Sequence, residues 1–495
     1  MKNKLTIIRN SDETKKRKKQ NTKRALGIVF LLVVCFLVSF LIVEIDNDFK
    51  IGLEYARDYF VTTFILFGFS VASYVYLRSI KNTVNLDKVN NASVPTYVLY
   101  SVVFISLILY TVIAKYLNVY AIPFLLSSLL LLMLTDKSYA NIGNLLTNIL
   151  FIMIKLCSYL LAGTVSDTAA IFKYLIVVVL AMFGGMLSLS MVQTTKTRFN
   201  QLVSSILLGV LIFSINLLIQ FGYLGFSKDL FINLWIFAGT VISIGVYYIL
   251  LPVYEKVFNI CTDSKLMDIC KDNAPLLKEL KEKAPGTYNH SLMVAHLSEV
   301  CATAIGENPL MARAAAYYHD VGKLYNPKYF TENLAGNEEN PHDNLIPEVS
   351  AGIIIKHTTK GAEMIKEHNL PQSLQRVALE HHGNSVVMFF FNKAQSLSER
   401  AIDKNLYSYP NNKPSTKISA IIMICDTAEA ATRANANKSY EEMCQMIKGL
   451  VNGKLNDGQF DNCDITMQDL YLITEAIINY VPGMYHKRPK YSDKN

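Results

Sequence analysis

The chain has 495 residues, of which 51% are hydrophobic and 18% are charged, and its mean hydropathy is +0.25. This length has room for two or three domains, and the positive hydropathy indicates that one of them is not soluble. The net charge is +8, and the ten Lys or Arg within residues 1–24, set against Asp12 and Glu13, account for all of it. The basic balance is therefore a local cytoplasmic tail, and it argues against a nucleic-acid polymer as partner.

Eight long apolar runs follow this tail, and each approaches the ~20 residues that cross a bilayer as a helix. We therefore expect a polytopic transmembrane helical bundle over residues 25–252, surrounded by lipid. The fourth run is the shortest and contains Pro123. Eight crossings would return the chain to the side on which it began. The runs are 25–43, 59–77, 97–114, 120–134, 143–161, 170–191, 202–221 and 230–251.

The charges beside these runs predict their orientation. A basic cluster next to an apolar helix marks the cytoplasmic side. The first loop, about 44–58, is acidic, whereas the second and sixth loops carry Lys and Arg. Both termini are therefore expected in the cytoplasm, and the chain is predicted to be a multi-pass protein of the inner (cytoplasmic) membrane. The first run favours a signal anchor over a cleaved signal peptide.

Few charges fall inside the membrane part. Lys155 and Lys173 are the clearest, and both lie near the outer ends of their predicted helices, where a lysine can snorkel to the interface. They give weak support to a transporter. Gly68 and the pair Gly184–Gly185 permit close helix contact, which fits packing within the bundle or a homodimer equally well.

Pro252 is expected to end the last span, and residues 253–265 are interpreted as a polar linker. From residue 266 to 495 the patterns are helical, with no strand pattern. The predicted fold class is therefore all-α, with about eight membrane spans followed by a cytosolic all-helical domain.

All nine histidines lie from His290 onward. His319 and Asp320 are adjacent, and residues next to each other on a helix point about 100° apart, so this pair can reach two metal ions, with Asp320 as the bridge. Imidazole and carboxylate ligands suit Mn, Fe or Zn better than Ca or Mg, and no Cys-x-x-Cys pair supports a zinc finger. A lone His-Asp dipeptide is a weak signal. The remote partners that strengthen it are His290, His357, His381, His382 and Asp426.

Five segments around these residues resemble the signatures of HD-domain phosphodiesterases of the 7TM-HD, or PgpH, type. The resemblance extends from Gly286 to about Arg433 and implies a cytosolic domain that hydrolyses cyclic di-AMP to linear pApA on a two-metal centre. The preference for adenine rests wholly on this resemblance. The segments are Gly286–Ser291, Tyr317–Lys323, Asn340–Asp343, Glu380–Gly383 and Asp426–Ala431.

One feature departs from that family. Its members typically carry a large extracellular domain after the first span, whereas here only about residues 44–58 separate the first two runs. Ligand sensing by such a domain is therefore in doubt for this chain, but the expected set of metal ligands is complete.

The expected centre holds two divalent ions, with Mn or Fe favoured. One ion takes His290, His319, Asp320 and Asp426, and the other takes Asp320, His357, His381 and, less firmly, His382, which has a competing role in orienting a phosphate. A bridging hydroxide would attack phosphorus in line and expel a ribose 3′-oxygen.

Two further residues are expected to contact the substrate. Lys323 is a catalytic and substrate-binding candidate that can neutralise a phosphate oxygen, although a solvated lysine at a helix end is the alternative. His342 is a candidate substrate contact, with a loop-stabilising turn as the alternative. Hydrolysis of cyclic di-GMP or ppGpp, or a membrane receptor or scaffold whose HD domain only binds a nucleotide, remain open as functions.

Overall fold

The computed structural model describes residues 27–50, 52, 55–80, 94–162, 168–192, 197–224, 230–334, 338–410, 412–435 and 437–484. The chain divides into two compact units, residues 1–262 and 263–495. Within the described residues both units are helical, and the only β-type pairings are two isolated bridges. The all-α fold class is therefore confirmed. The basic tail at 1–24 and His486 lie outside the described residues.

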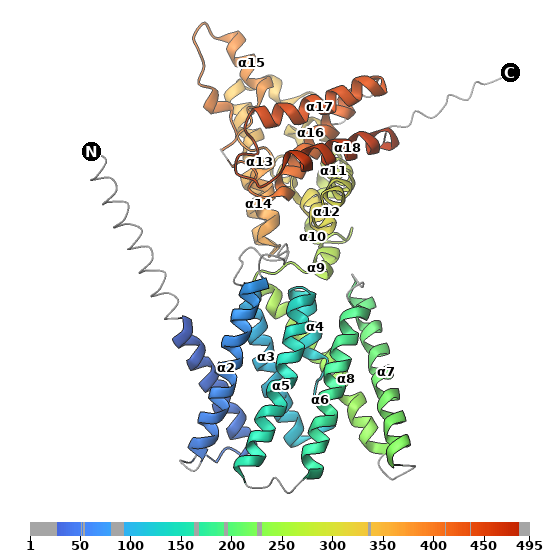
Figure 1. The fold of residues 1–495 in the computed structure, drawn as a ribbon. Coiled ribbons are helices and arrows are strands. Elements are labelled where there is room, and N and C mark those ends of the chain that lie inside the picture. The colour runs from blue at the N-terminus through green and yellow to red at the C-terminus, as the bar shows by residue number, and fades with distance from the viewer. Residues whose placement is uncertain are drawn as a thin grey trace, which may run out of the picture. The chain divides into compact units, whose positions relative to one another are not determined.

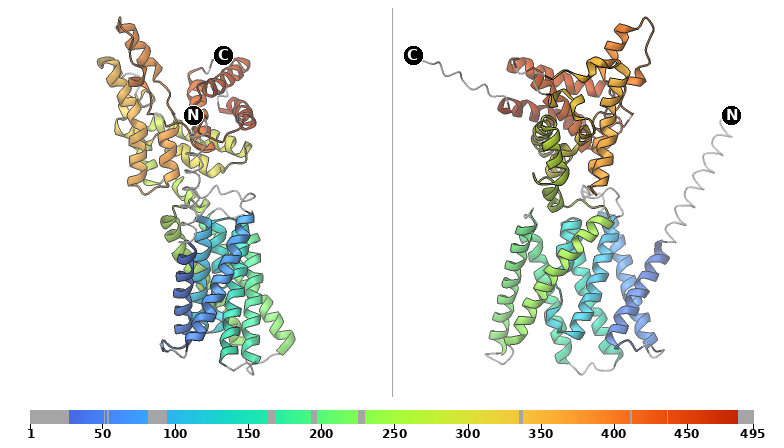
Figure 2. Two further views of the ribbon diagram at one scale, coloured as in Figure 1. Left: turned by 60° about the vertical axis from the view of Figure 1, so that its left-hand side comes forward. Right: turned by 180° about the vertical axis from the view of Figure 1, so that it is seen from behind.

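The first unit is a bundle of helices that run side by side in all three views (Figures 1 and 2). Among the described residues, seven helices are long and apolar enough to cross a membrane, which agrees with a transmembrane bundle. They are Gly27–Asp46, α2 (Ala56–Ile80), α3 (Val94–Tyr116), α5 (Lys137–Leu161), α6 (Thr168–Val192), α7 (Arg198–Leu224) and α8 (Leu230–Val257).

The fourth predicted span is not a continuous helix. Lys115, near the end of α3, and Lys155, near the end of α5, both bind Asp46, so α3 and α5 end on the same side and run parallel. The chain between them must return across the bundle. It does so as the 3-10 turn η2 (Val119–Ala121), a break at Pro123 and the nine-residue helix α4 (Leu126–Leu134).

Packing explains how this broken segment is tolerated. A nine-residue helix rises only about 13.5 Å, roughly half of the ~30 Å hydrocarbon layer. Irregular backbone is acceptable at that depth where protein covers it, and every residue of α4 is buried. Gly239 of α8 allows the closest approach, because a β-carbon there would lie 2.6 Å from the Ile122 carbonyl oxygen.

The expected end of the last span at Pro252 is also wrong. Helix α8 continues through Pro252 to Val257, and α9 (Asp263–Ile269) begins six residues later. An interior proline removes one backbone hydrogen bond at a cost of about 3 kcal/mol. Leu251 and Tyr254 are buried in the core of the membrane unit on either side of it, and their packing offsets this cost.

Lys155 does not snorkel as expected. Its side chain is buried, and its ammonium lies 2.6 and 2.7 Å from the two carboxylate oxygens of Asp46. Lys115 forms a second ion pair with Asp48 at 2.6 Å. The acidic first loop thus supplies counter-charges that join the end of the first helix to α3 and α5. Lys173, in contrast, is exposed.

The second unit is built around α11, which packs against α12, α16 and α18. Proline opens four of its helices, where the missing N–H leaves no intrahelical bond unmade. The helices after α9 are α10 (Pro275–Lys283), α11 (Pro285–Ala304), α12 (Pro309–Tyr318), α13 (Pro347–Glu367), α14 (Gln372–Glu380), α15 (Met388–Leu397), α16 (Lys417–Ala434), α17 (Tyr440–Asn456) and α18 (Met467–Met484).

Candidate metal centre

Six elements of the second unit bring seven side chains to one place. His319 is the C-cap residue of α12, and Asp320 directly precedes the 3-10 turn η3 (Val321–Tyr325). Most of these side chains are buried, but Asp426 keeps 13% and His382 25% of its side-chain surface. Those two residues therefore mark the open side of the centre. The others are His290 on α11, His357 on α13 and His381 just after α14.

A glycine contact places Asp320 beside His357. A β-carbon at Gly322 would lie 1.9 Å from the His357 carbonyl oxygen and 2.4 Å from the Gly361 nitrogen. Only glycine permits this approach of η3 to the backbone of α13. The Gly322 of the Tyr317–Lys323 motif thus fixes the distance between two candidate ligands that are far apart in sequence.

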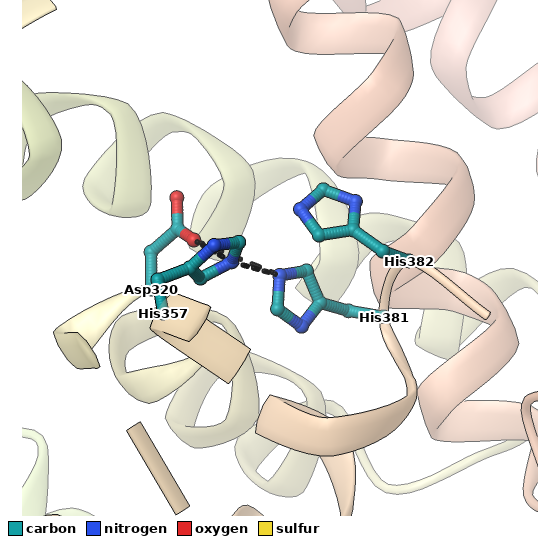
Figure 3. Close-up of side chains that lie close together, drawn as sticks. All are labelled: Asp320, His357, His381 and His382. Carbon is teal, nitrogen blue, oxygen red and sulfur yellow. Dashed lines mark hydrogen bonds and ion pairs between the residues drawn. The ribbon is translucent and has the colours of Figure 1, made fainter. Parts of the chain in front are cut away.

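The candidate ligands form two groups. Within each group, one ligand atom per residue lies within 4.8 Å of all the others. The first group is Asp320, His357, His381 and His382, whose side chains converge in Figure 3. The second group is His290, His319 and Asp426.

Asp320 lies between the two groups. Its Oδ1 faces the first, 3.3 Å from His357 Nε2 and 3.6 Å from His381 Nε2. Its Oδ2 faces the second, 3.4 Å from His319 Nε2 and 3.8 Å from His290 Nε2. One carboxylate thus presents a different oxygen to each group, as a bridging ligand would.

The hydrogen bonds of three imidazoles place a hydrogen on the outer nitrogen, Nδ1, of each ring. Nδ1 of His319 lies 2.6 Å from the Ala316 carbonyl, and Nδ1 of His357 lies 2.6 Å from the Ile354 carbonyl. Because a carbonyl only accepts, these Nδ1 atoms carry the hydrogen, and in the neutral rings Nε2 holds a lone pair. His381 Nδ1 is 3.0 Å from the Ala378 carbonyl in the same way.

Lone pairs therefore face lone pairs at the centre. Nε2 of His357 lies 3.2 Å from Nε2 of His381, and both point at a carboxylate oxygen. His319 Nε2 and Asp320 Oδ1 are buried with no hydrogen-bond partner. Such an arrangement is unfavourable unless a cation lies between the donors. The residues present thus fit divalent metal ions of the kind that imidazole and carboxylate bind.

The pKa values of these side chains also favour metal binding. Burial lowers the pKa of His381 and of His382, which keeps both rings neutral and able to coordinate. Burial opposes ionisation of Asp320, but Lys323 and His319 outweigh it and hold the pKa of this carboxyl well below its usual range. Burial also lowers the pKa of His319, but the negative charges of Asp320 and Asp426 outweigh it and raise that pKa to about 10. In the metal-free protein this ring therefore holds a proton beside the two carboxylates, where a metal ion would otherwise supply the positive charge.

Lys323 contacts protein carboxylates in the structure. Its ammonium lies 2.7 Å from Asp320 Oδ2 and 2.7 Å from Glu332 Oε1, and 5.1 Å from the centre of the Phe330 ring. These charges raise the pKa of Lys323 despite its burial. The contacts orient Asp320, whereas the expected contact of Lys323 with a phosphate stays a prediction.

His342 and His382 differ in their surroundings. His342 is buried outside both ligand groups, with Nε2 2.8 Å from the Tyr329 carbonyl and its ring 4.9 Å from that of Phe390. These contacts fit the loop-stabilising alternative, and a contact with substrate stays a prediction. His382 belongs to the first group, and its ring stacks on Tyr409 with 4.4 Å between ring centres.

The sequence interpretation missed Glu429. This residue is 3% exposed, and its Oε2 lies 2.5 Å from His290 Nδ1, so that Nε2 of the same ring faces Asp426 Oδ1 at 2.9 Å. A carboxylate on the outer nitrogen fixes the tautomer of a metal-binding histidine and makes it a better ligand. Glu429 follows Asp426 by three residues on α16, and this spacing, which puts both on one helix face, was the available signal.

Comparison with known proteins agrees with this geometry. Residues 287–431 match the family model described as HD domain. The chain is 42% identical over 258 residues to the cyclic-di-AMP phosphodiesterase PgpH of Listeria monocytogenes, and 40% identical over 257 residues to that of Bacillus subtilis. Each alignment covers 52% of this chain and 35% of the relative. The chain thus spans about a third of the length of these relatives.

Two solved structures also align with part of this chain. The crystal structure of the L. monocytogenes PgpH HD domain is 43% identical and is covered completely, with 43% of this chain aligned and a TM-score of 0.41. The same domain solved in complex with cyclic di-AMP is also 43% identical, with a TM-score of 0.42. From the HD match and the sequence identity to the PgpH relatives, the chain belongs to the HD-domain proteins, and its C-terminal unit is of the PgpH type.

Proposed function

We propose that this chain is an integral membrane phosphodiesterase that hydrolyses cyclic di-AMP to linear pApA, with two divalent metal ions held by its HD domain. The observation that carries the proposal is Asp320, whose two oxygens face two separate groups of candidate ligands. The names of the PgpH relatives supply the substrate, and the apolar helices of the first unit support attachment to a membrane.

The residues of such a centre would have two kinds of role, metal binding and the positioning of ligands. His290, His319 and Asp426 would hold one ion, His357, His381 and His382 the other, and Asp320 would join them. Two divalent ions, when bound, lower the pKa of a water and stabilise charge on the attacking and leaving oxygens. Lys323 and Glu332 fix the carboxylate of Asp320, and Glu429 fixes the ring of His290. Burial of the imidazoles keeps bulk water out, which strengthens every charge interaction at the centre.

The charge distribution supports the proposed orientation. The basic residues of 1–24 precede the first apolar helix, and an even number of passes, counting the broken segment, returns the chain to the same side. The HD domain would then face the cytoplasm, where a cyclic dinucleotide second messenger is available.

A product assay tests the proposal. The full chain, purified in detergent and loaded with Mn²⁺ or Fe²⁺, is incubated with cyclic di-AMP, cyclic di-GMP and ppGpp, and the metal content is measured on the same sample. We expect pApA from cyclic di-AMP, at a rate that exceeds that with the other two, and about two ions per chain. Tight binding of cyclic di-AMP without turnover in any metal would contradict the proposal, and faster cleavage of another nucleotide would change its substrate.

A further inference from the structure

A lysine outside the matched HD region lies beside the open edge of the metal centre. Lys454, near the end of α17, donates from Nζ to the hydroxyl of Ser385 at 3.3 Å. Ser385 follows His382 by three residues, and its N–H donates to the His382 carbonyl at 3.1 Å. Its own carbonyl accepts from the N–H of Tyr409 at 2.9 Å, the residue that stacks on His382. A short chain of contacts thus connects the ammonium of Lys454 to a candidate ligand.

Lys454 also differs from the other lysines of this region. It is partly buried, and among the described residues no carboxylate lies within ion-pair distance of its ammonium. Lys323 is bound to Asp320 and Glu332, and Lys413 lies 2.9 Å from Asp461. Burial lowers the pKa of Lys454, an effect that the charges of Asp426 and Asp457 oppose. A partly desolvated cation with only a hydroxyl partner is unfavourable unless an anion binds to it.

The location suits a ligand that reaches beyond the metals. The most exposed candidate ligands are His382 and Asp426, so a substrate enters on their side. Lys454 lies on that side, next to the turn after His382 and within the influence of Asp426. A cyclic dinucleotide has two phosphodiester groups, each with one negative charge. The metals can neutralise the one that is cut, and the other needs a counter-charge elsewhere.

We propose that Lys454 binds the second, uncut phosphate of the cyclic dinucleotide and thereby favours substrates with two phosphodiesters over those with one. This inference rests on the proposed function and adds the residue that recognises the far half of the substrate. Lysine suits the role because its ammonium is a compact point charge that can donate hydrogen bonds to phosphate oxygens in several directions.

The test compares two substrates on the full, Mn²⁺-loaded chain. Cyclic di-AMP carries the second phosphate, and bis(4-nitrophenyl) phosphate does not. In Lys454→Met we expect the KM for cyclic di-AMP to rise roughly tenfold or more, as for loss of a charge-assisted hydrogen bond. The fold-increase in KM for bis(4-nitrophenyl) phosphate should be roughly ten times smaller. The kcat for cyclic di-AMP should stay within about twofold of the wild type, because the metal ligands are intact. Lys454→Arg should recover part of the lost affinity, because it restores the charge.

Lys448→Met is the matched control, since Lys448 is exposed on the same helix. Metal content and unfolding temperature of each variant show whether a change comes from the phosphate contact or from damage to the fold. An unchanged KM for cyclic di-AMP in Lys454→Met, or an equal rise for both substrates, would overturn the inference and leave the proposed function standing. A wild type that cleaves bis(4-nitrophenyl) phosphate but not cyclic di-AMP would refute the proposed function and this inference with it.

Discussion

A buried ion pair in the membrane unit (residues 1–262) and the candidate metal centre in the HD unit (residues 263–495) differ in how their charges are matched. In the membrane unit, the ammonium of Lys155 is matched by both oxygens of Asp46, so the pair is complete within the protein. In the HD unit, lone pairs of His357, His381 and Asp320 face one another, and buried atoms remain without partners. A complete pair fixes one helix against another, whereas an incomplete set of donors indicates a site for something that the chain itself does not supply.

Among the changes that test this comparison, replacement of Asp320 should have the largest effect on activity. Asp320→Ala removes the carboxylate that faces both ligand groups and leaves Lys323 with Glu332 as its remaining carboxylate partner. We expect kcat/KM for cyclic di-AMP to fall by roughly 10³-fold or more, and the metal content to fall with it. Both are measured on the purified full chain, the first by product formation and the second by elemental analysis.

The sequence offers a matched control for that variant. His342 and Asp343 form a second adjacent His-Asp pair, and Asp343 is exposed in the loop before α13. Asp343→Ala should keep its metal. If it lost as much metal and activity as Asp320→Ala, the assignment of the bridge to Asp320 would be wrong.

Removal of metal should destabilise the HD unit and leave the membrane unit unchanged. A ligand at 100 times its Kd stabilises the state that binds it by about 2.7 kcal/mol, so chelation should loosen the HD unit and abolish turnover until Mn²⁺ is restored. Hydrogen exchange followed by mass spectrometry should show faster exchange in α11, α13 and α16, with α3 and α5 unchanged. Equally faster exchange in both units would contradict the view that bound metal stabilises the HD unit alone.

Glu429→Gln should weaken metal binding without removing a ligand. The amide cannot hold the outer nitrogen of His290 as a carboxylate does, and loss of such a partner costs roughly 10–100-fold in metal affinity. Activity at limiting Mn²⁺ should therefore fall, and saturating Mn²⁺ should restore most of it.

The exposed Glu441, changed to Gln, is the control for Glu429. A Glu429 variant whose activity stays low at every Mn²⁺ concentration would assign this residue a direct part in the reaction.

Lys155→Met should have the smallest effect on hydrolysis. It leaves the carboxylate of Asp46 without its ammonium partner, which should destabilise the membrane unit by about 1–3 kcal/mol. The cost is less than for a fully buried pair because Asp46 keeps 20% of its side-chain surface. Thermal unfolding of the detergent-solubilised chain measures the loss, and the double change with Asp46→Asn should recover part of it. A change in kcat per metal-loaded molecule would reveal coupling between this ion pair and the HD domain.

The sequence predicted the helical class and the candidate ligands, because hydrophobic period and residue type carry that information. It did not predict the break at Pro123, since composition alone cannot distinguish an apolar run that spans lipid from one that is enclosed by other helices. Pro252 was misleading in a related way, because the packing of Leu251 and Tyr254 that sustains α8 is tertiary.

The same limit applies to charges. The pairing of Lys155 with Asp46 joins positions 109 residues apart, and no local pattern records it. The contact of Lys454 on α17 with the turn after His382 likewise depends on tertiary packing. The same is true of the contact of Glu429 on α16 with His290 on α11.

The enclosed helix α4 has a consequence for biogenesis. All nine of its residues are buried among α3, α5, α6 and α8, and much of that cover is synthesised after it. A half-length segment with irregular backbone cannot rest stably in lipid by itself. Residues 117–136 can therefore reach their stable position in the bundle only after the later helices have been synthesised and inserted at the translocon.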